Sequence, residues 1–150
     1  MGFLTEQTQI DFSETGLLSH ARGFEYRPEQ QQMAVAVAET LEGESALLAE
    51  AGTGVGKSLA YLIPAIRFAL ERGRKAVIST HTINLQEQLF YKDIPTVARA
   101  LNCHFDAALL KGRANYLCRT RLRRALEQSD DLFNQAETKQ LYDLLAWSKD

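Results

Sequence analysis

The chain has 150 residues and a formal net charge of −2, with 45% hydrophobic and 24% charged residues. This length suits one domain of ordinary size, and the composition is that of a soluble globular protein rather than a disordered one. The net charge provides no global basic field, so any binding of nucleic acid must be local. The N-terminus lacks the basic and apolar regions of a signal peptide, and no apolar run is long enough to cross a membrane.

Helical and strand-like patterns alternate along residues 25–110, after a polar arm at 1–24 that shows no clear periodicity. Pro28 suits the first position of a helix, and hydrophobic residues at every fourth position give that helix a buried face until Gly43. Short apolar runs predict three buried strands, at 46–49, 76–79 and 105–110. Further helices are expected at 57–72, 83–92 and 96–101.

This alternation predicts an α/β fold with a parallel sheet and right-handed crossovers. From residue 111 the chain changes to a basic loop and then to helical sequence without another strand. We therefore expect three parts: the N-terminal arm at 1–24, an α/β lobe at 25–110, and a helical part at 111–150.

A glycine-rich turn joins the first expected strand to the next helix, which is the context of a Walker A phosphate-binding loop. Glycines let successive backbone N–H groups surround phosphates, and the following helix adds its positive dipole end. Lys57 would reach the β- and γ-phosphates, and the Ser58 hydroxyl would hold Mg²⁺. The alternative is a glycine-rich turn with an unrelated lysine, but the flanking elements favour a nucleoside-triphosphate site. Its residues are Glu50, Ala51, Gly52, Thr53, Gly54, Val55, Gly56, Lys57 and Ser58.

Four segments follow one another along the chain: residues 27–33 (Arg-Pro-Glu-Gln-Gln-Gln-Met), 50–58, 78–89 and 110–118. In this order and spacing they resemble the XPD/DinG-type iron–sulfur DNA helicases of superfamily 2, and in particular the N-terminal part of the DinG/YoaA type. The last segment is similar to the Lys-Gly-Arg-x-Asn-Tyr-x-Cys sequence that carries the first cluster cysteine in that family. The resemblance covers residues from about 24 to 150.

This resemblance implies a RecA-like P-loop core that runs into a helical iron–sulfur insertion. It implies a 5′-to-3′ ATP-dependent DNA helicase of the repair or replication type, although the residues themselves do not give the polarity. The cofactors implied are ATP, Mg²⁺ and a [4Fe–4S] cluster, and the partner is single-stranded DNA, bound by a monomeric motor. A P-loop enzyme whose two cysteines cannot form a disulfide framework is expected in the cytoplasm.

The resemblance assigns the recognition of adenine to Gln30. A glutamine side chain can accept a hydrogen bond from N6 of adenine and donate one to N7. Tyr26 could stack on the base, and Arg27 is expected to support this loop or a phosphate. The alternative is an ordinary solvated helix N-terminus that is rich in glutamine.

Thr80, Thr82 and Gln86 are the first candidate contacts for single-stranded DNA. The threonines follow the second expected strand, where hydroxyls and helix N–H groups could hold DNA phosphates. An ordinary helix N-cap would explain the same threonines. Gln86 resembles the glutamine of the family's motif Ia, and a glutamine on an exposed helix face remains the alternative.

Residues 111–124 hold six cations and no acid. Lys111 and Arg113 are expected to contact DNA phosphates, and Tyr116 offers a face on which a base could stack. A solvated basic face is the alternative. Cys118 is implied by the resemblance to be the first of four thiolate ligands of the cluster, with the other three outside this sequence. Cys103 is expected to be a small buried thiol.

The acidic strand end that completes the Mg²⁺ site and orients the attacking water is missing from this sequence. We therefore expect an N-terminal piece of a longer enzyme, which alone binds nucleotide weakly and neither hydrolyses ATP nor unwinds DNA. A P-loop kinase would not explain residues 111–118, and the Asn-Lys-x-Asp segment with which GTPases recognise the base is absent from this sequence. A truncated, non-hydrolysing ATP- or DNA-binding module that regulates a partner is the remaining alternative.

Overall fold

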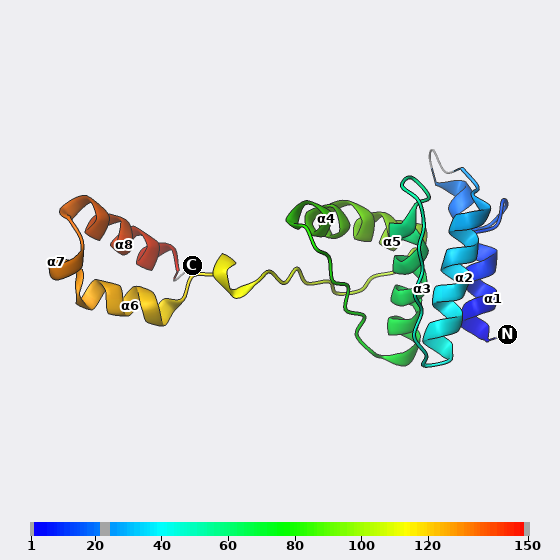
Figure 1. Ribbon diagram of the computed structural model, residues 1–150, viewed down its shortest axis with the longest axis horizontal. Helices are drawn as coiled ribbons and strands as arrows, with labels where there is room; N and C mark the ends of the chain where they lie inside the picture. The colour runs from blue at the N-terminus through cyan, green and yellow to red at the C-terminus, as the bar shows by residue number, and fades with distance from the viewer. Residues whose placement is uncertain (1, 22–24, 149–150) are drawn as a thin grey trace. The chain divides into compact units, whose positions relative to one another are not determined.

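The computed structural model describes residues 2–21 and 25–148, and it divides into two compact units, Met1–Leu109 and Leu110–Asp150 (Figure 1). Within the described residues, the first unit consists of helices and helical turns joined by extended segments. These elements are α1 (Phe3–Asp11), the 3₁₀ turn η1 (Leu17–His20), α2 (Pro28–Glu42), α3 (Lys57–Arg72), α4 (Ile83–Gln88), the π-helical turn η2 (Leu89–Asp93) and α5 (Ile94–Ala100).

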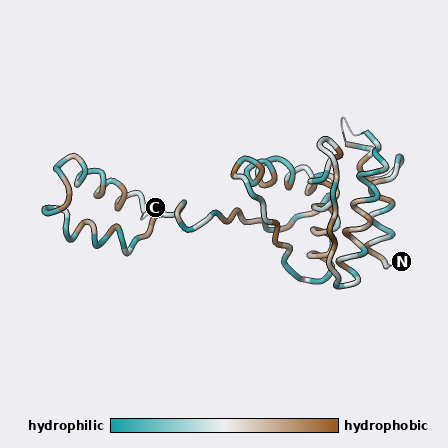
Figure 2. The backbone as a smooth tube through the Cα atoms, viewed as in Figure 1, coloured by the Kyte–Doolittle hydropathy of each residue, from teal (hydrophilic) through white to brown (hydrophobic). Residues whose placement is uncertain are grey.

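The expectation of an α/β fold with a parallel sheet is wrong, because none of the described residues forms a strand. The three expected strands are extended segments outside the helices, and their hydrophobic side chains lie largely in solvent. Figure 2 colours the backbone by hydropathy and shows hydrophobic stretches in the extended parts of the chain as well as in the helices. Leu48 is 101% exposed, Val77 91% and Leu110 81%. An apolar run becomes a buried strand only where a neighbouring strand pairs with its backbone and a second layer covers its side chains. No such pairing occurs between the described segments.

The core of the first unit lies around α3, which packs against α1 and α2 and also against Leu89 of η2 and Val97 of α5. Ala34 and Ala38 are fully buried on one face of α2, and such small side chains let neighbouring helices approach closely. Helix α3 contributes Leu62 and Ile63, which are also fully buried. The helices expected from residue 28 and at 57–72 are confirmed by α2 and α3.

Residues 3–11, for which the sequence showed no clear periodicity, form helix α1. Leu4 is 1% exposed, as is Phe12 directly after the helix, and the other buried residues of α1 are polar: Thr5, Thr8 and Asp11. Polar residues on a buried helix face conceal the hydrophobic repeat from which an amphipathic helix is predicted. The end of the N-terminal segment, residues 22–24, lies outside the described residues.

The helices expected at 83–92 and 96–101 form one continuous helical stretch, α4–η2–α5. The wider π-helical turn η2 lies directly before Pro95, which has no N–H to donate and would clash with a preceding α-helical carbonyl. Thr82 begins this stretch by accepting a hydrogen bond from the N–H of Leu85.

The second unit contains η3 (Arg113–Asn115), α6 (Arg119–Glu127), α7 (Ser129–Leu132) and α8 (Gln135–Trp147). Helix α6 packs on α8, and Leu122 of α6 is 5% exposed. Asn134 and Glu137 form a capping box that fixes the start of α8. Of the helices described in the two units, none is long and apolar enough to cross a membrane.

Candidate functional site

The glycine loop, residues 51–58, contains two residues with left-handed backbone conformation. Gly54 has φ 85° and Gly56 has φ 86°. Residues other than glycine adopt this backbone conformation only with strain. A Cβ atom added at Gly52 or Gly54 would meet no atom within 4 Å. The loop therefore has open space beside Gly52 and Gly54, next to a backbone conformation that favours glycine. A concave loop of this kind can accommodate a phosphate group.

Lys57 and Ser58, the last two residues of the loop, are also the first two residues of α3. The Lys57 ammonium donates hydrogen bonds to the carbonyls of Ala51, at 2.8 Å, and Gly52, at 2.7 Å, so it lies across the start of the loop. Burial raises the pKa of the Tyr61 phenol; a hydrogen bond with Ser58 acts against this rise and the Asp93 carboxylate adds to it. The Ser58 hydroxyl is thus near Tyr61, one turn along the same helix.

Two side chains from the start of α2 hold the carbonyls of the left-handed glycines. The amide nitrogen of Gln30 donates to the carbonyl of Gly56 at 2.9 Å, and Gln30 is 4% exposed. The Arg27 guanidinium donates to the carbonyl of Gly54 and also pairs with Glu25 at 3.0 Å. The structure therefore brings Gln30 and Arg27 to the loop with Lys57. Of the other loop residues, Thr53 precedes Gly54 and Val55 lies between Gly54 and Gly56.

Gln30 approaches Gly56 so closely that a larger residue at position 56 would displace the Gln30 amide. A Cβ atom on Gly56 would lie 2.1 Å from the Gln30 amide nitrogen. The conformation and the close contact together demand glycine at this position, whereas Gly54 is constrained only by its backbone conformation.

Thr80, Thr82 and Gln86 lie at the start of the α4 stretch, on a different element from the glycine loop. The Thr80 hydroxyl donates to the carbonyl of Thr82 at 3.1 Å, and the Thr82 hydroxyl accepts from the N–H of Leu85 at 3.3 Å. The N-cap function considered for Thr82 is therefore present, and a capping hydroxyl can still face a phosphate. Gln86 is half-buried in α4.

The basic segment, residues 111–124, belongs to the second unit. The backbone N–H of Lys111 donates to the Tyr116 hydroxyl at 2.8 Å, which fixes the ring at the start of the segment while leaving it 51% exposed. Arg113 is exposed in η3. The arginines of α6 are exposed as well, and in the described part of the chain none of them forms an ion pair: Arg119, Arg121, Arg123 and Arg124.

Cys118 is the exposed residue that precedes α6. The pKa of the Cys118 thiol is lowered, chiefly by the backbone N–H of Arg121. Slight burial opposes this shift, and the N–H of Thr120 and the charges of Arg121 and Arg113 lower the pKa further. A thiolate-favouring position suits a metal ligand. However, Cys103 belongs to the first unit, and no three metal-ligating side chains come together among the described residues. The described residues therefore do not bring together the four thiolates that a [4Fe–4S] cluster requires.

Comparison with known families decides what kind of protein carries this loop. A family model described as DEAD/DEAH box helicase matches residues 27–128, from Arg27 through the glycine loop to the end of α6. The chain belongs to the DEAD/DEAH box helicase family.

Known relatives of this helicase chain include YoaA and DinG proteins, which confirms the resemblance found in the sequence. It is 50% identical over 118 residues to the ATP-dependent DNA helicase YoaA of Haemophilus influenzae, which covers 78% of this chain and 18% of that protein. It is 46% identical over 114 residues, 73% of this chain and 17% of the relative, to the ATP-dependent helicase DinG of Mycobacterium tuberculosis. The 3′-5′ exonuclease DinG of Bacillus subtilis is 36% identical over 135 residues, 90% of this chain and 14% of that protein. The chain spans less than a fifth of the length of these relatives.

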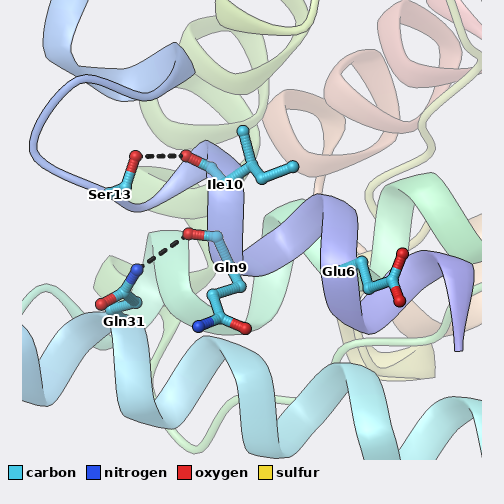
Figure 3. Close-up of a pocket in the computed structure, with 5 residues that line it drawn as sticks. All are labelled: Glu6, Gln9, Ile10, Ser13 and Gln31. Atoms are coloured by element: carbon cyan, nitrogen blue, oxygen red, sulfur yellow. Dashed lines mark hydrogen bonds between the residues drawn. The ribbon is translucent and has the colours of Figure 1, made fainter. Parts of the chain in front are cut away.

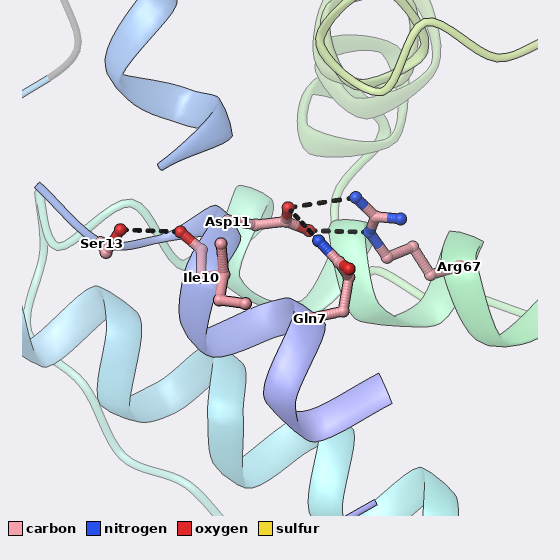
Figure 4. A network of polar contacts seen from close by, with 5 residues as sticks. All are labelled: Gln7, Ile10, Asp11, Ser13 and Arg67. Carbon is pink, nitrogen blue, oxygen red and sulfur yellow. Dashed lines mark hydrogen bonds and ion pairs between the residues drawn. The ribbon is translucent and has the colours of Figure 1, made fainter. Parts of the chain in front are cut away.

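Two contacts of this helicase chain escaped the sequence analysis. Asp11 and Arg67 form a two-point ion pair, with Nε–Oδ2 at 2.7 Å and a second contact at 3.1 Å (Figure 4). Gln31 links α2 to the backbone of α1. The partners of the ion pair are 56 positions apart, so no spacing rule could join them, and nothing in a run of three glutamines distinguishes Gln31 from its neighbours.

Proposed function

We propose that this chain is the ATP-binding part of an ATP-dependent DNA helicase. The observation that carries the proposal is the glycine loop, in which two left-handed glycines are held by Arg27 and Gln30 and followed by Lys57. Such loops bind phosphates through successive backbone N–H groups and the positive end of the next helix. Membership of the helicase family and the ATP-dependent activities named for YoaA and DinG support the same function.

In this proposal the triphosphate occupies the open space beside Gly52 and Gly54. Lys57 then exchanges the carbonyls of Ala51 and Gly52 for β- and γ-phosphate oxygens, which carry the negative charge that an ammonium prefers. Ser58 would hold Mg²⁺, which when bound neutralises charge on the phosphates. An amide nitrogen has two hydrogens, so Gln30 can bind Gly56 and still donate to adenine.

DNA binding is assigned to two places on the chain. Thr80, Thr82 and Gln86 offer hydroxyl and amide groups, and the basic segment offers exposed cations beside the Tyr116 ring. Phosphate contacts and base stacking together are the usual means of holding single-stranded DNA. By resemblance, movement is 5′ to 3′, the process is DNA repair or replication, and Cys118 is the first ligand of an iron–sulfur cluster.

We further propose that the 150 residues alone bind nucleotide weakly and do not hydrolyse it. The acidic group that orients the attacking water in such motors is missing from this sequence. Turnover then requires the whole protein; the matched segments make up less than a fifth of the relatives' length.

The experiment compares Lys57→Ala with Lys75→Ala in the whole protein. Lys75 is an exposed lysine of the same unit, outside the loop. DNA-stimulated ATP hydrolysis and unwinding of duplexes with 5′ or 3′ tails are measured for both. The proposal predicts that Lys57→Ala abolishes both activities, that Lys75→Ala keeps them, and that only 5′-tailed duplexes are unwound. Normal hydrolysis by Lys57→Ala would overturn the assignment of the loop, and ATP binding without any hydrolysis by the whole protein would favour the regulatory module.

A further inference from the structure

We propose that helix α1, acting through Gln31, positions the ATP site: it holds the first turn of α2, and that turn holds the glycine loop. Gln31 and Asp11 are then positioning residues, because neither lies in the loop itself. This inference rests on the proposed function, since it concerns the affinity of the same loop for a triphosphate.

Helix α1 is fastened at its N-terminal end by the last residue of α2. The Glu42 carboxylate accepts hydrogen bonds from the N–H of Leu4 at 2.8 Å, the N–H of Thr5 at 3.3 Å and the Thr5 hydroxyl at 2.6 Å. The first N–H groups of a helix have no partner within it, and the helix dipole favours an anion there. One carboxylate therefore ties the start of α1 to the far end of α2.

At its other end α1 is fastened to α3. Asp11, 2% exposed in its side chain, binds the Arg67 guanidinium at two points, and Gln7 donates to the same carboxylate at 3.2 Å (Figure 4). A paired charge with this little exposure is costly to separate, because either partner would be left desolvated and alone. Together with the buried side chains of Leu4 and Phe12, the ion pair fixes α1 against both α2 and α3.

Gln31 transmits this fixed position to the start of α2. Its amide nitrogen donates to the carbonyl of Gln9 in α1 at 2.8 Å (Figure 3), and its amide oxygen accepts from the Tyr26 hydroxyl at 2.9 Å. The carbonyl of Gln9 is among the last four of α1, which have no helical N–H to bind. A single side chain thus joins α1, the first turn of α2 and the aromatic ring that is a candidate for stacking on adenine.

The same turn of α2 holds the glycine loop through Gln30 and Arg27, as described above. The side chains of this one turn therefore connect the backbone of α1 to the carbonyls of Gly54 and Gly56, and the backbone of α2 joins them. Without support, a loop with two left-handed glycines has many accessible conformations. The apparent dissociation constant for a ligand rises in proportion as the binding-competent conformation becomes less populated. Loss of the α1 contact should therefore weaken binding without removing any group that touches ATP.

The experiment compares Gln31→Ala with Gln32→Ala in the whole protein. Gln32 is the next residue of α2, is exposed, and makes no hydrogen bond through its side chain within the described residues. Dissociation constants are measured for Mg·ATP and for inorganic triphosphate. We expect Gln31→Ala to raise both constants by the same factor, about fivefold, and Gln32→Ala to change neither. In steady-state hydrolysis the KM for ATP should rise while kcat stays unchanged.

The two probes separate positioning from direct contact with the base. If Gln31 touched adenine, Gln31→Ala would weaken ATP binding and leave triphosphate binding unchanged, and that result would overturn the inference. Equal affinities for Gln31→Ala and the wild type would overturn it too, while the proposed function would stand. If the wild-type protein bound neither probe, the proposed function itself would fail.

A double-mutant cycle with Gln30→Ala supplies the second arm. Because Gln31 acts through the turn that carries Gln30, the two substitutions together should raise the dissociation constant for triphosphate less than the product of their separate factors. Asp11→Asn should show the same behaviour, with Glu6→Gln, an exposed acid of α1, as its matched control. Fully multiplicative effects would contradict a common route through α2.

Discussion

The two units hold their candidate sites in opposite ways. In the first unit the glycine loop is held by Gln30 and Arg27, and the helix that bears Gln30 is itself packed between α1 and α3. In the second unit the basic segment is exposed, and of the described residues only Leu122 and Ser129 are buried there. The difference follows from the ligands proposed. Phosphates in a loop require a fixed backbone, whereas a DNA strand requires cations and an aromatic face within reach.

The largest expected effect tests whether the N-terminal segment belongs to the core of the first unit. Phe12→Ala removes a fully buried ring and should lower the free energy of unfolding by about 3–5 kcal/mol. Phe3 is 68% exposed, so Phe3→Ala should change the free energy of unfolding by less than ~0.5 kcal/mol. Thermal or urea unfolding followed by circular dichroism measures both. Equal effects of the two substitutions would show that α1 is a loosely attached arm.

The next effect concerns the close contact between Gly56 and Gln30. Gly56→Ala places a Cβ where the Gln30 amide lies and forces a left-handed conformation on alanine, at a strain of about 1–3 kcal/mol. Mg·ATP affinity should fall accordingly. Gly73→Ala is the matched control, because it also forces a left-handed conformation on alanine but lies at the end of α3, outside the loop, where the added Cβ would meet no atom within 4 Å. Equal losses at both positions would contradict the described loop conformation.

Substitutions confined to the second unit test whether DNA binding and ATP binding belong to separate units. Replacing Arg121, Arg123 and Arg124 by alanine should reduce the slope of log affinity for single-stranded DNA against log salt by about 2, since each phosphate contact contributes ~0.7. Mg·ATP affinity without DNA should stay the same. Lys139→Ala, an exposed cation of α8 in the same unit, serves as control. An unchanged salt slope in the triple variant would remove α6 from the DNA site.

The smallest effect is a pH dependence of the α1 contact. Burial opposes charge on Glu42, but hydrogen bonds from Thr5 and the N–H groups of Leu4 and Thr5 outweigh it, so that the pKa of Glu42 is lowered. The unfolded chain therefore holds the proton more tightly. The stabilisation is present above the ordinary glutamate pKa of about 4.3 and is lost as the pH falls through the lowered value.

Glu42→Gln should accordingly lower the free energy of unfolding by about 0.3–1 kcal/mol at pH 7, and the difference should shrink as the pH falls below the ordinary glutamate pKa. Denaturant unfolding across this range measures it. Glu39→Gln, an exposed acid of the same helix, should show no such difference. A Glu42→Gln effect that persisted undiminished at pH 3 would exclude the carboxylate charge as its cause.

Local sequence signals predicted the helices around the loop and the loop itself. Pro28 and the glycines at 56 and 73 mark where α2 begins and where α3 begins and ends, because their backbone preferences act without distant partners. The three expected strands could not be judged in this way, since pairing depends on neighbours that no local pattern supplies. Helix α1 was missed because its buried face carries the polar residues Thr8 and Asp11. The charge of Asp11 is compensated there by Arg67, which lies far along the chain and which no local pattern points to.

The central claim is that the glycine loop, held by Arg27 and Gln30, binds a nucleoside triphosphate. Calorimetric titration of Mg·ATP into the folded whole protein tests it most directly. The account predicts saturable binding of one nucleotide per chain, lost in Lys57→Ala. Heats that never saturate in the wild type, or equal binding by Lys57→Ala, would contradict it.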